Sequence, residues 1–327
     1  MAKRMLLCVL VGVMMLGCAF VSVAAAAEYE IAVIIKATDS DFWQTVLMGA
    51  RKAMADNPEK INVTTYGPPS EADIDQQVAI LENVVSTSPN AIVIASTSSE
   101  ATIPAIEDAM NSGIPVVLID NRVFTDNFTS FLATNNYVAG GMAAEAMVAK
   151  WKELGIDPAG KKAIVNTAMA GVQVLVDREK GFVDRLKELE PNVELLETRY
   201  NDNDIIKSLS ITTDIITATP DLVGIFAANN HSGIGVARAL IELDAADKIV
   251  AYAFDSDEEE VKALESGVLK GLVVQDPFGM GYRGVMFAVD AIEGRPVEKE
   301  VDTGATLATR ENMNNPDVAA QLDPSLR

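Results

Sequence analysis

Short apolar runs rich in β-branched residues alternate with amphipathic helical stretches along this 327-residue chain. Residues 30–37, 61–67, 91–96 and 114–120 (EIAVIIKA, INVTTYG, AIVIAS and IPVVLID) are such runs, and a helical pattern follows each of the first three. Continuous apolar strands separated by helices are typical of a parallel sheet that is covered on both faces. This part of the chain therefore predicts one doubly wound α/β domain.

The same rhythm restarts in the second half of the chain. Strands are predicted at 161–168, 193–200, 221–229 and 248–255, with a helical stretch before each next strand. The chain is longer than the ~250–300 residues at which a single core stops growing, so two domains are expected. Residues 131–147 lead from a strand into a helix without a Ser/Gly-rich linker, which suits a hinge better than a flexible tether.

The first 27 residues have the pattern of a secretory signal. Lys-Arg at positions 3–4 precedes an uncharged apolar run over 5–23, and an A-x-A step ending at Ala27 is the predicted cleavage site. Two alternatives stay open: an uncleaved membrane anchor, and lipidation of Cys18, whose preceding residues imperfectly resemble a lipoprotein processing site. In each case we expect an exported protein, which places it in the periplasm.

Charge and cysteine content restrict the partners and the covalent chemistry. The formal net charge of −21 and the pI near 4.4 argue against nucleic acids and anionic membranes, which need basic patches. A folded domain with this surface should stay soluble and monomeric. Both cysteines, Cys8 and Cys18, lie in the leader, so cleavage after Ala27 would leave no disulfide.

No catalytic or metal-binding pattern stands out. The one histidine, His231, is expected to cap a helix or to form part of a cleft wall, because no nucleophile motif accompanies it. The sequence lacks the set of Cys and His residues that usually binds zinc. The acidic run 255–260 is expected to open a helix, where carboxylates favour the dipole, and residues 201–204 (NDND) are expected to cap one. The sequence therefore predicts no enzyme, no metal site and no cofactor.

Polar and aromatic side chains gather directly after the predicted strands. The carboxyl ends of parallel strands meet at one edge of a sheet, so two facing α/β domains would place these residues around one cleft. Asp, Asn, Gln and Arg satisfy the vicinal hydroxyls of a neutral polyhydroxylated ligand, while Phe and Trp cover the C–H faces of its ring. The groups are Ser40–Trp43, Asp120–Arg122, Asn229–His231, Phe254–Asp255 and Gln275.

With these residues collected, the chain resembles the periplasmic sugar-binding proteins of ABC transporters, in their ribose-binding-like branch. The resemblance covers essentially all of the chain after the leader. It rests on motifs in a fixed order, namely DSDFW (39–43), IPVVLIDN (114–121), DREKGF (177–182), FAANN (226–230), AFD (253–255) and VVQDP (273–277). It implies the periplasmic binding protein type 1 fold, which has two Rossmann-like doubly wound domains joined by a multi-strand hinge.

The resemblance also implies a division of the chain and a role for each matching residue. Phe42 and Trp43 match the aromatic pair that encloses the sugar ring. The other matches are Asp120, Arg178, Asn229, Phe254, Asp255 and Gln275, the last of them at a hinge crossing. The implied parts are a signal peptide (1–27), an N-terminal lobe (28–134 plus 276–302) and a C-terminal lobe (135–275 plus 303–327).

Three features depart from the ribose-binding pattern. The first loop carries Lys36 and Ser40 where ribose binders have Ser and Asn, Asn121 stands where they have Arg, and Asn203 replaces the aromatic residue of the second domain. One wall of the cleft is therefore expected to be more polar and to carry an additional cation. All four residues belong to the predicted ligand site.

Lys36 has two interpretations: it pairs with Asp39 or Asp120, or it contacts the ligand directly. Proteins similar to the autoinducer-2 receptor also place a lysine there. The implied ligand is a pentose, a hexose or a sugar alcohol, which hinge closure delivers to the membrane subunits of an ABC transporter. The alternative is a receptor for a signalling sugar such as autoinducer-2, or for a chemotaxis ligand, presented to a chemoreceptor or another membrane sensor.

Residues 279–284 (GMGYRG) satisfy the G-x-G-x-x-G pattern of a dinucleotide-binding loop. That motif should be followed by a second strand that ends in an acid ~20 residues further on. Here Gly294 and Pro296 end the helix instead. The resemblance places these glycines in a helix that returns to the first domain, so we expect no nicotinamide cofactor.

Overall fold

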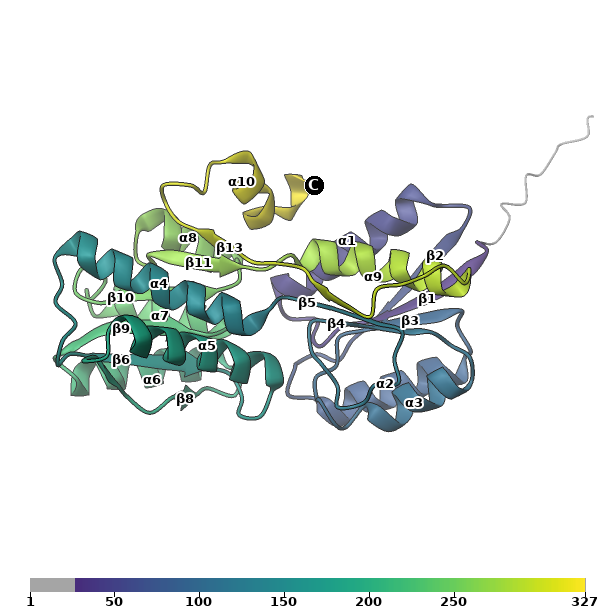
Figure 1. The fold of residues 1–327 in the computed structure, drawn as a ribbon, viewed down its shortest axis with the longest axis horizontal. Helices are drawn as coiled ribbons and strands as arrows, with labels where there is room; N and C mark the ends of the chain where they lie inside the picture. Colours follow the sequence, from purple (N-terminus) through teal and green to yellow (C-terminus); the bar gives the residue numbers. More distant parts are fainter. Residues whose placement is uncertain (1–26, 327) are drawn as a thin grey trace, which may run out of the picture.

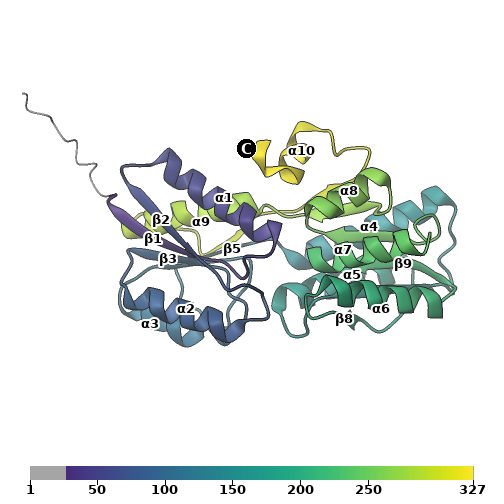
Figure 2. The same ribbon diagram turned by 180° about the vertical axis from the view of Figure 1, so that it is seen from behind.

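The computed structural model describes residues 27–326 and contains two α/β lobes set end to end (Figure 1). Figure 2 shows the same arrangement from behind. The predicted signal peptide and Cys18 lie outside the described residues, apart from Ala27 itself. Among the helices of residues 27–326, none is long and apolar enough to span a membrane.

The N-terminal lobe is built on a six-stranded parallel sheet in the order β12-β5-β4-β3-β1-β2. Helices α1 and α9 cover one face, and α2 and α3 cover the other (Figure 1). The strands are β1 (Tyr29–Ile34), β2 (Ile61–Tyr66), β3 (Ala91–Ile94), β4 (Val116–Ile119), β5 (Ser130–Ala133) and β12 (Glu300–Asp302). The helices are α1 (Asp41–Asp56), α2 (Ile74–Ser86), α3 (Ile103–Asn111) and α9 (Pro277–Ile292).

The C-terminal lobe has a seven-stranded sheet in the order β13-β11-β10-β9-β6-β7, with β8 also paired to β6. Only β13 runs antiparallel to its neighbour. The strands are β6 (Lys162–Thr167), β7 (Glu194–Leu195), β8 (Arg199–Tyr200), β9 (Leu222–Ala227), β10 (Val250–Phe254), β11 (Gly271–Val274) and β13 (Thr306–Ala308). The helices are α4 (Asn136–Leu154), α5 (Gln173–Leu189), α6 (Ile205–Ala218), α7 (Asn230–Glu242), α8 (Glu258–Ser266), α10 (Pro316–Leu322) and the 3-10 turn η1 (Pro324–Leu326).

The predicted strand at 193–200 is divided into two short strands, β7 and β8. Both pair with β6 alone, at the edge of the sheet. Residues 194–197 (ELLE) do not alternate between apolar and polar. A strand with one buried face needs that alternation, so a longer strand is not favoured there. The other predicted strands are present, although their ends differ by a few residues.

The chain crosses between the lobes three times: from β5 to α4, from β11 to α9 and from β12 to β13 (Figure 1). Two crossings are tied together, because the Thr134 hydroxyl donates to the Gly304 carbonyl at 3.1 Å. One carboxylate oxygen of Asp302 accepts from the backbone N–H groups of both Asn135 and Gly304, at 3.0 and 2.8 Å. The multi-strand hinge predicted between the lobes is therefore present.

The glycines of GMGYRG let α9 pack closely against α1. A Cβ added to Gly281 would lie 1.9 Å from the carbonyl oxygen of Val46, and one added to Gly49 would lie 2.0 Å from that of Phe278. The backbone N–H of Gly279 donates to the helix-capping Asp276 carboxylate at 2.9 Å. The glycines lie in a helix of the first lobe, as the resemblance implied, and there they serve helix packing.

Helices α4 and α5 of the C-terminal lobe meet in the same way, which gives a matched pair of substitutions. A Cβ at Gly140 would lie 2.1 Å from the carbonyl oxygen of Arg178, whereas one at Gly141 would come no closer than 3.7 Å to Arg185 and Gly181. Gly140→Ala should destabilise the protein by about 1–3 kcal/mol through overpacking. Gly141→Ala should be neutral or stabilising by up to ~1 kcal/mol. Denaturant unfolding measures both, and equal effects would contradict this packing.

Candidate functional site

A small cavity lies between the lobes, where the carboxyl ends of both sheets meet. Its volume is about 40 Å³, well below the ~300–1,000 Å³ of a typical small-molecule pocket. A larger ligand therefore requires the lobes to separate or the side chains to turn. The lining residues are Lys36, Ser40, Phe42, Trp43, Glu71, Asp120, Ala168, Val172, Val174, Leu175, Arg178, Asn229, Asn230, Asp255 and Gln275.

The N-terminal lobe contributes a buried ion pair. Lys36 Nζ lies 2.6 Å from Asp120 Oδ2, and both side chains are at most 5% exposed. Lys36 follows β1, and Asp120 follows β4 directly. The ammonium also lies 5.4 Å from the centroid of the Trp43 ring. Lys36 thus pairs with Asp120 and lines the cavity as well, so its two predicted interpretations are compatible.

Two carboxylates occupy corresponding places in the two lobes. Asp120 follows β4 with φ 64°, and Asp255 follows β10 with φ 78°. Among residues with a Cβ, Asp is one of the few that tolerate the left-handed region, which suits it to such a turn. Neighbouring strands hold both residues, because the Asp120 N–H donates to the Leu132 carbonyl and the Asp255 N–H donates to the Val273 carbonyl. The sharp turn at each strand end presents a carboxylate to the cavity.

Arg178 of α5 is anchored by hydrogen bonds within its own lobe. Its Nε donates to Asn136 Oδ1 at 2.8 Å, and its Nη1 donates to the Ala228 carbonyl at 2.9 Å. The guanidinium carbon lies 3.8 Å from the centroid of the Phe254 ring. Burial lowers the pKa of Arg178, whereas the charges of Asp255 and then Asp120 oppose this shift. The group stays a cation with remaining donors for a ligand, since guanidinium does not deprotonate in proteins.

A hinge residue and a carboxylate form a second polar pair. Gln275 Nε2 donates to Asp255 Oδ1 at 2.7 Å. Burial raises the pKa of Asp255, while the Arg178 charge and the Gln275 hydrogen bond oppose that rise. Gln275 Oε1 is buried and has no hydrogen-bond partner within residues 27–326. A buried acceptor without a partner is unfavourable, because it has lost its hydrogen bonds to water. A ligand hydroxyl that donates to Gln275 Oε1 would remove this cost.

The first turn of α1 supplies the aromatic surface. The rings of Phe42 and Trp43 lie edge to face, with their centroids 4.7 Å apart and an interplanar angle of 80°. Trp43 Nε1 donates to Glu71 Oε1 at 2.7 Å, which fixes the indole. The sequence prediction did not include Glu71, although its place in the loop after β2 follows the same strand-end rule.

Three predicted residues do not line the cavity. The side chain of Asn121 turns away and donates to the Ser96 carbonyl at 3.2 Å. Asn203 lies behind Asn229, whose side-chain amide donates to Asn203 Oδ1 at 2.8 Å. Phe254 is the last residue of β10 and is fully buried beneath the cleft arginine. Its contribution is to support that cation.

Asn230, which the sequence placed at the cleft but not among the ligand-binding residues, links the lobes. Its Nδ2 donates to Ser40 Oγ of the N-terminal lobe at 2.9 Å and to Asp257 Oδ2 at 3.1 Å. The interlobe bond can form only when the lobes are close. Asn230 therefore contributes to the closed arrangement as well as to the cavity lining.

Comparison with known proteins agrees with this geometry. A family model described as a periplasmic binding protein domain matches residues 31–296. This chain belongs to the periplasmic binding protein family. The predicted fold class is thereby confirmed, because the two lobes, their parallel sheets and the family match all agree.

Solved structures of this family extend the likeness over nearly the whole chain. A carbohydrate transporter solute-binding protein from Agrobacterium radiobacter, in complex with D-arabinose, superposes with a TM-score of 0.87 at 38% identity, covering 91% of this chain and 100% of its own. An ABC transporter solute-binding protein from Agrobacterium vitis with bound D-fucose has a TM-score of 0.82 at 33% identity, covering 90% and 99%. The ribose import binding protein of Haemophilus influenzae is 28% identical over 292 residues, which are 89% of this chain and 95% of that protein.

The remaining polar motifs have structural roles in this binding protein. His231 Nδ1 lies 2.8 Å from the Asn203 carbonyl oxygen, in the wall behind the cavity. Asp204 caps α6 by accepting from the Lys207 N–H, as predicted. Asp257 and Glu260 form a capping box at the start of α8, which confirms the helix-opening interpretation of the acidic run. Within residues 27–326, no group of three or more His, Cys, Asp or Glu side chains is placed to hold a metal ion.

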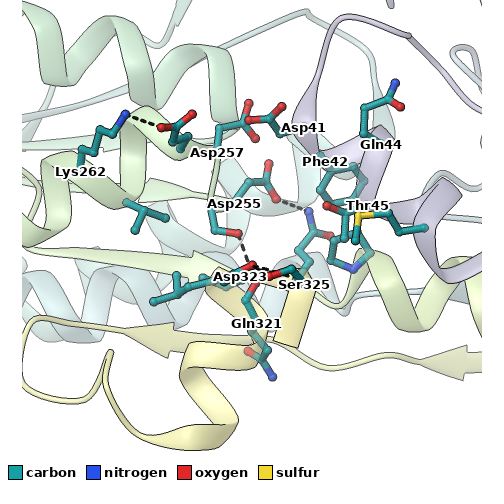
Figure 3. Close-up of a pocket in the computed structure, with 18 of the residues that line it drawn as sticks. Asp41, Phe42, Gln44, Thr45, Asp255, Asp257, Lys262, Gln321, Asp323 and Ser325 are labelled. Atoms are coloured by element: carbon teal, nitrogen blue, oxygen red, sulfur yellow. Dashed lines mark hydrogen bonds and ion pairs between the residues drawn. The ribbon is translucent and has the colours of Figure 1, made fainter. Parts of the chain in front are cut away.

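A larger cavity, of about 490 Å³, lies next to the small one and shares Phe42, Asp255 and Gln275 with it. Figure 3 shows it between α1, α8 and the C-terminal segment, which contributes Gln321 and Asp323. Size alone would favour this space as the ligand site. The smaller cavity is nevertheless the candidate ligand site, because the polar side chains that follow the strands of both lobes converge there.

Breaking the buried ion pair should be costly. Lys36→Met leaves the Asp120 carboxylate buried without its partner charge, which should lower the free energy of unfolding by about 3 kcal/mol. The double variant Lys36→Met/Asp120→Asn should recover most of this loss, because no buried charge remains. Denaturant unfolding of both variants measures the difference. Equal losses in the single and double variants would contradict the pairing.

Asp257 should make stability depend on pH. Burial, and then the charges of Asp255 and Asp41, raise its pKa from 3.8 to about 7. A raised pKa in the folded state gives stability that is complete below 3.8 and is lost as the pH rises through about 7. From pH 6 to pH 8, wild type should therefore lose about 1 kcal/mol more than Asp257→Asn. Asp317→Asn, which removes an exposed carboxylate elsewhere, is the control for the loss of one negative charge. Identical curves of stability against pH for wild type and Asp257→Asn would refute the shift.

Proposed function

We propose that this chain is an exported solute-binding protein that captures a sugar or sugar-like polyol between its lobes and delivers it to an ABC transporter. The observation that carries the proposal is the convergence of Asp120, Arg178, Asp255 and Gln275 on one interlobe cavity beside the aromatic residues of α1. Relatives solved with D-arabinose and D-fucose, and a ribose import protein, support this class of ligand.

The charges of the cavity favour a neutral ligand over an acidic one. Two cations, Lys36 and Arg178, are accompanied by three carboxylates, those of Glu71, Asp120 and Asp255. Carboxylates accept hydrogen bonds from hydroxyls, and the cations donate to hydroxyl and ring oxygens. Both kinds of group are present on the N-terminal and the C-terminal side, so a sugar can bond to both lobes at once.

Binding to both lobes would favour closure. A ligand that contacts both lobes stabilises the closed population, in which the Asn230–Ser40 bond is also formed. We propose residues 28–134 plus 276–302 and residues 135–275 plus 303–327 as the two moving bodies.

Cellular context extends the proposal. Relatives of this chain include a protein named as periplasmic, which supports export by the predicted signal peptide. We further propose that the protein acts as a monomer and that a chemoreceptor or sensor is an alternative partner for the same closed form. A transporter operon beside the gene would favour delivery, and a receptor gene there would favour signalling.

A thermal-shift screen of the chain from Glu28 tests the proposal. The panel consists of D-arabinose, D-fucose, D-ribose, other neutral sugars, sugar alcohols, sugar acids and autoinducer-2. A ligand at ~100 times its dissociation constant should add about 2.7 kcal/mol of stability. Arg178→Lys should weaken the response, whereas Arg238→Lys, at an arginine bonded to Glu259 on the surface, should not. If no compound of the panel raises the melting temperature, sugar binding is contradicted. A rise with sugar acids alone would contradict a neutral ligand.

A further inference from the structure

One side of the cavity differs from the rest. Ala168, Val172, Val174 and Leu175 line it from the β6–α5 connection and the start of α5. Three of them are at most 7% exposed, and all four belong to one apolar cluster. We call these four residues the aliphatic wall. The sequence prediction contained none of them. In this chain Asn203 replaces the aromatic residue that ribose binders have in the second domain.

The side chains of the aliphatic wall offer a hydroxyl no acceptor. Its side chains are hydrocarbon, and the Val172 carbonyl already accepts from the backbone N–H groups of Leu175 and Val176, at 3.0 Å each. The Ala168 carbonyl accepts from the Asp202 N–H at 2.9 Å. An O–H that points at this wall is therefore buried without a partner, which is unfavourable.

The rest of the lining is polar or aromatic. Apart from Phe42 and Trp43, every other lining residue carries a side-chain donor or acceptor. The wall is also fixed relative to the cleft arginine, because Val174 and Arg178 lie four residues apart on one face of α5. A sugar whose hydroxyls bond to Arg178 and the carboxylates must therefore present its least polar substituent to the wall.

On a pyranose ring, the substituent that varies most in polarity is the one on C5. It is hydrogen in a pentopyranose, methyl in a 6-deoxyhexose and hydroxymethyl in a hexose. We propose that the aliphatic wall receives this substituent, so that the site selects pentopyranoses and 6-deoxyhexoses over hexoses. The inference rests on the proposed function, since it names the sugar class within that function.

Homologous sugars that differ only at C5 test the selection. Such series are L-arabinose, D-fucose and D-galactose; D-arabinose, L-fucose and L-galactose; D-xylose, 6-deoxy-D-glucose and D-glucose; and D-ribose, 6-deoxy-D-allose and D-allose. Isothermal titration calorimetry gives the dissociation constant of each. In any series that binds, we expect the hydroxymethyl member to bind about 10- to 100-fold more weakly than the tighter of the other two.

A matched pair of variants assigns that selection to the wall. Val174→Thr adds a hydroxyl to the lining with little change of volume and should reduce the discrimination at least several-fold. Val176→Thr, two residues further along α5 at a side chain that is 40% exposed and outside the lining, should leave it unchanged. Thermal unfolding confirms that both variants are folded.

The outcomes separate the two proposals. Equal or tighter binding of the hydroxymethyl sugars would overturn the selection and leave sugar binding intact. Discrimination that Val174→Thr leaves unchanged would also overturn the role of the wall. Binding of sugar alcohols alone would contradict the selection but not the wider function, and binding of no sugar or polyol at all would contradict both.

Discussion

The buried charges of the cleft are the constraint on which most of the structure depends. Removing Lys36, Asp120, Arg178 and Asp255 from water is unfavourable unless each has a partner of opposite charge or a set of hydrogen bonds. The structure supplies these partners from within each lobe: Asp120 for Lys36, and Asn136 and Ala228 for the arginine. Each lobe can therefore present its charged groups in the correct orientation before the lobes meet on a ligand.

The α/β architecture itself places these charged groups at the cleft. Parallel strands end at one edge of each sheet, and a left-handed residue directly after β4 and β10 turns a carboxylate into the cleft. Close helix packing holds the supporting elements in place, because Gly140 brings α4 against the backbone of Arg178 itself. Some residues therefore serve both the fold and the site, so a substitution that disturbs this packing should also weaken ligand binding.

The sequence predicted the sheets and most of the strand-end residues, because periodic apolar runs locate strands and polar residues after them stand out. The sequence could not show which of two neighbouring side chains at a strand end points into the cleft. Phe254 ends β10 and enters the core, whereas the left-handed turn at Asp255 directs the next side chain into the cleft. Asn121 turns away from the cavity that Asp120 lines. Val174 and Leu175 have the spacing of ordinary helix core, and Glu71 stands in a loop without periodicity. Only the three-dimensional arrangement shows that they line the cavity between the lobes.

Small-angle X-ray scattering of the chain from Glu28, with and without a saturating sugar from the screen, tests the central claim most directly. The account predicts a smaller radius of gyration with sugar, because contacts to both lobes and the Asn230–Ser40 bond stabilise the closed form. Asn230→Ala should weaken binding but retain the compaction at saturation. An unchanged scattering profile at saturating sugar would contradict capture by closure of the lobes.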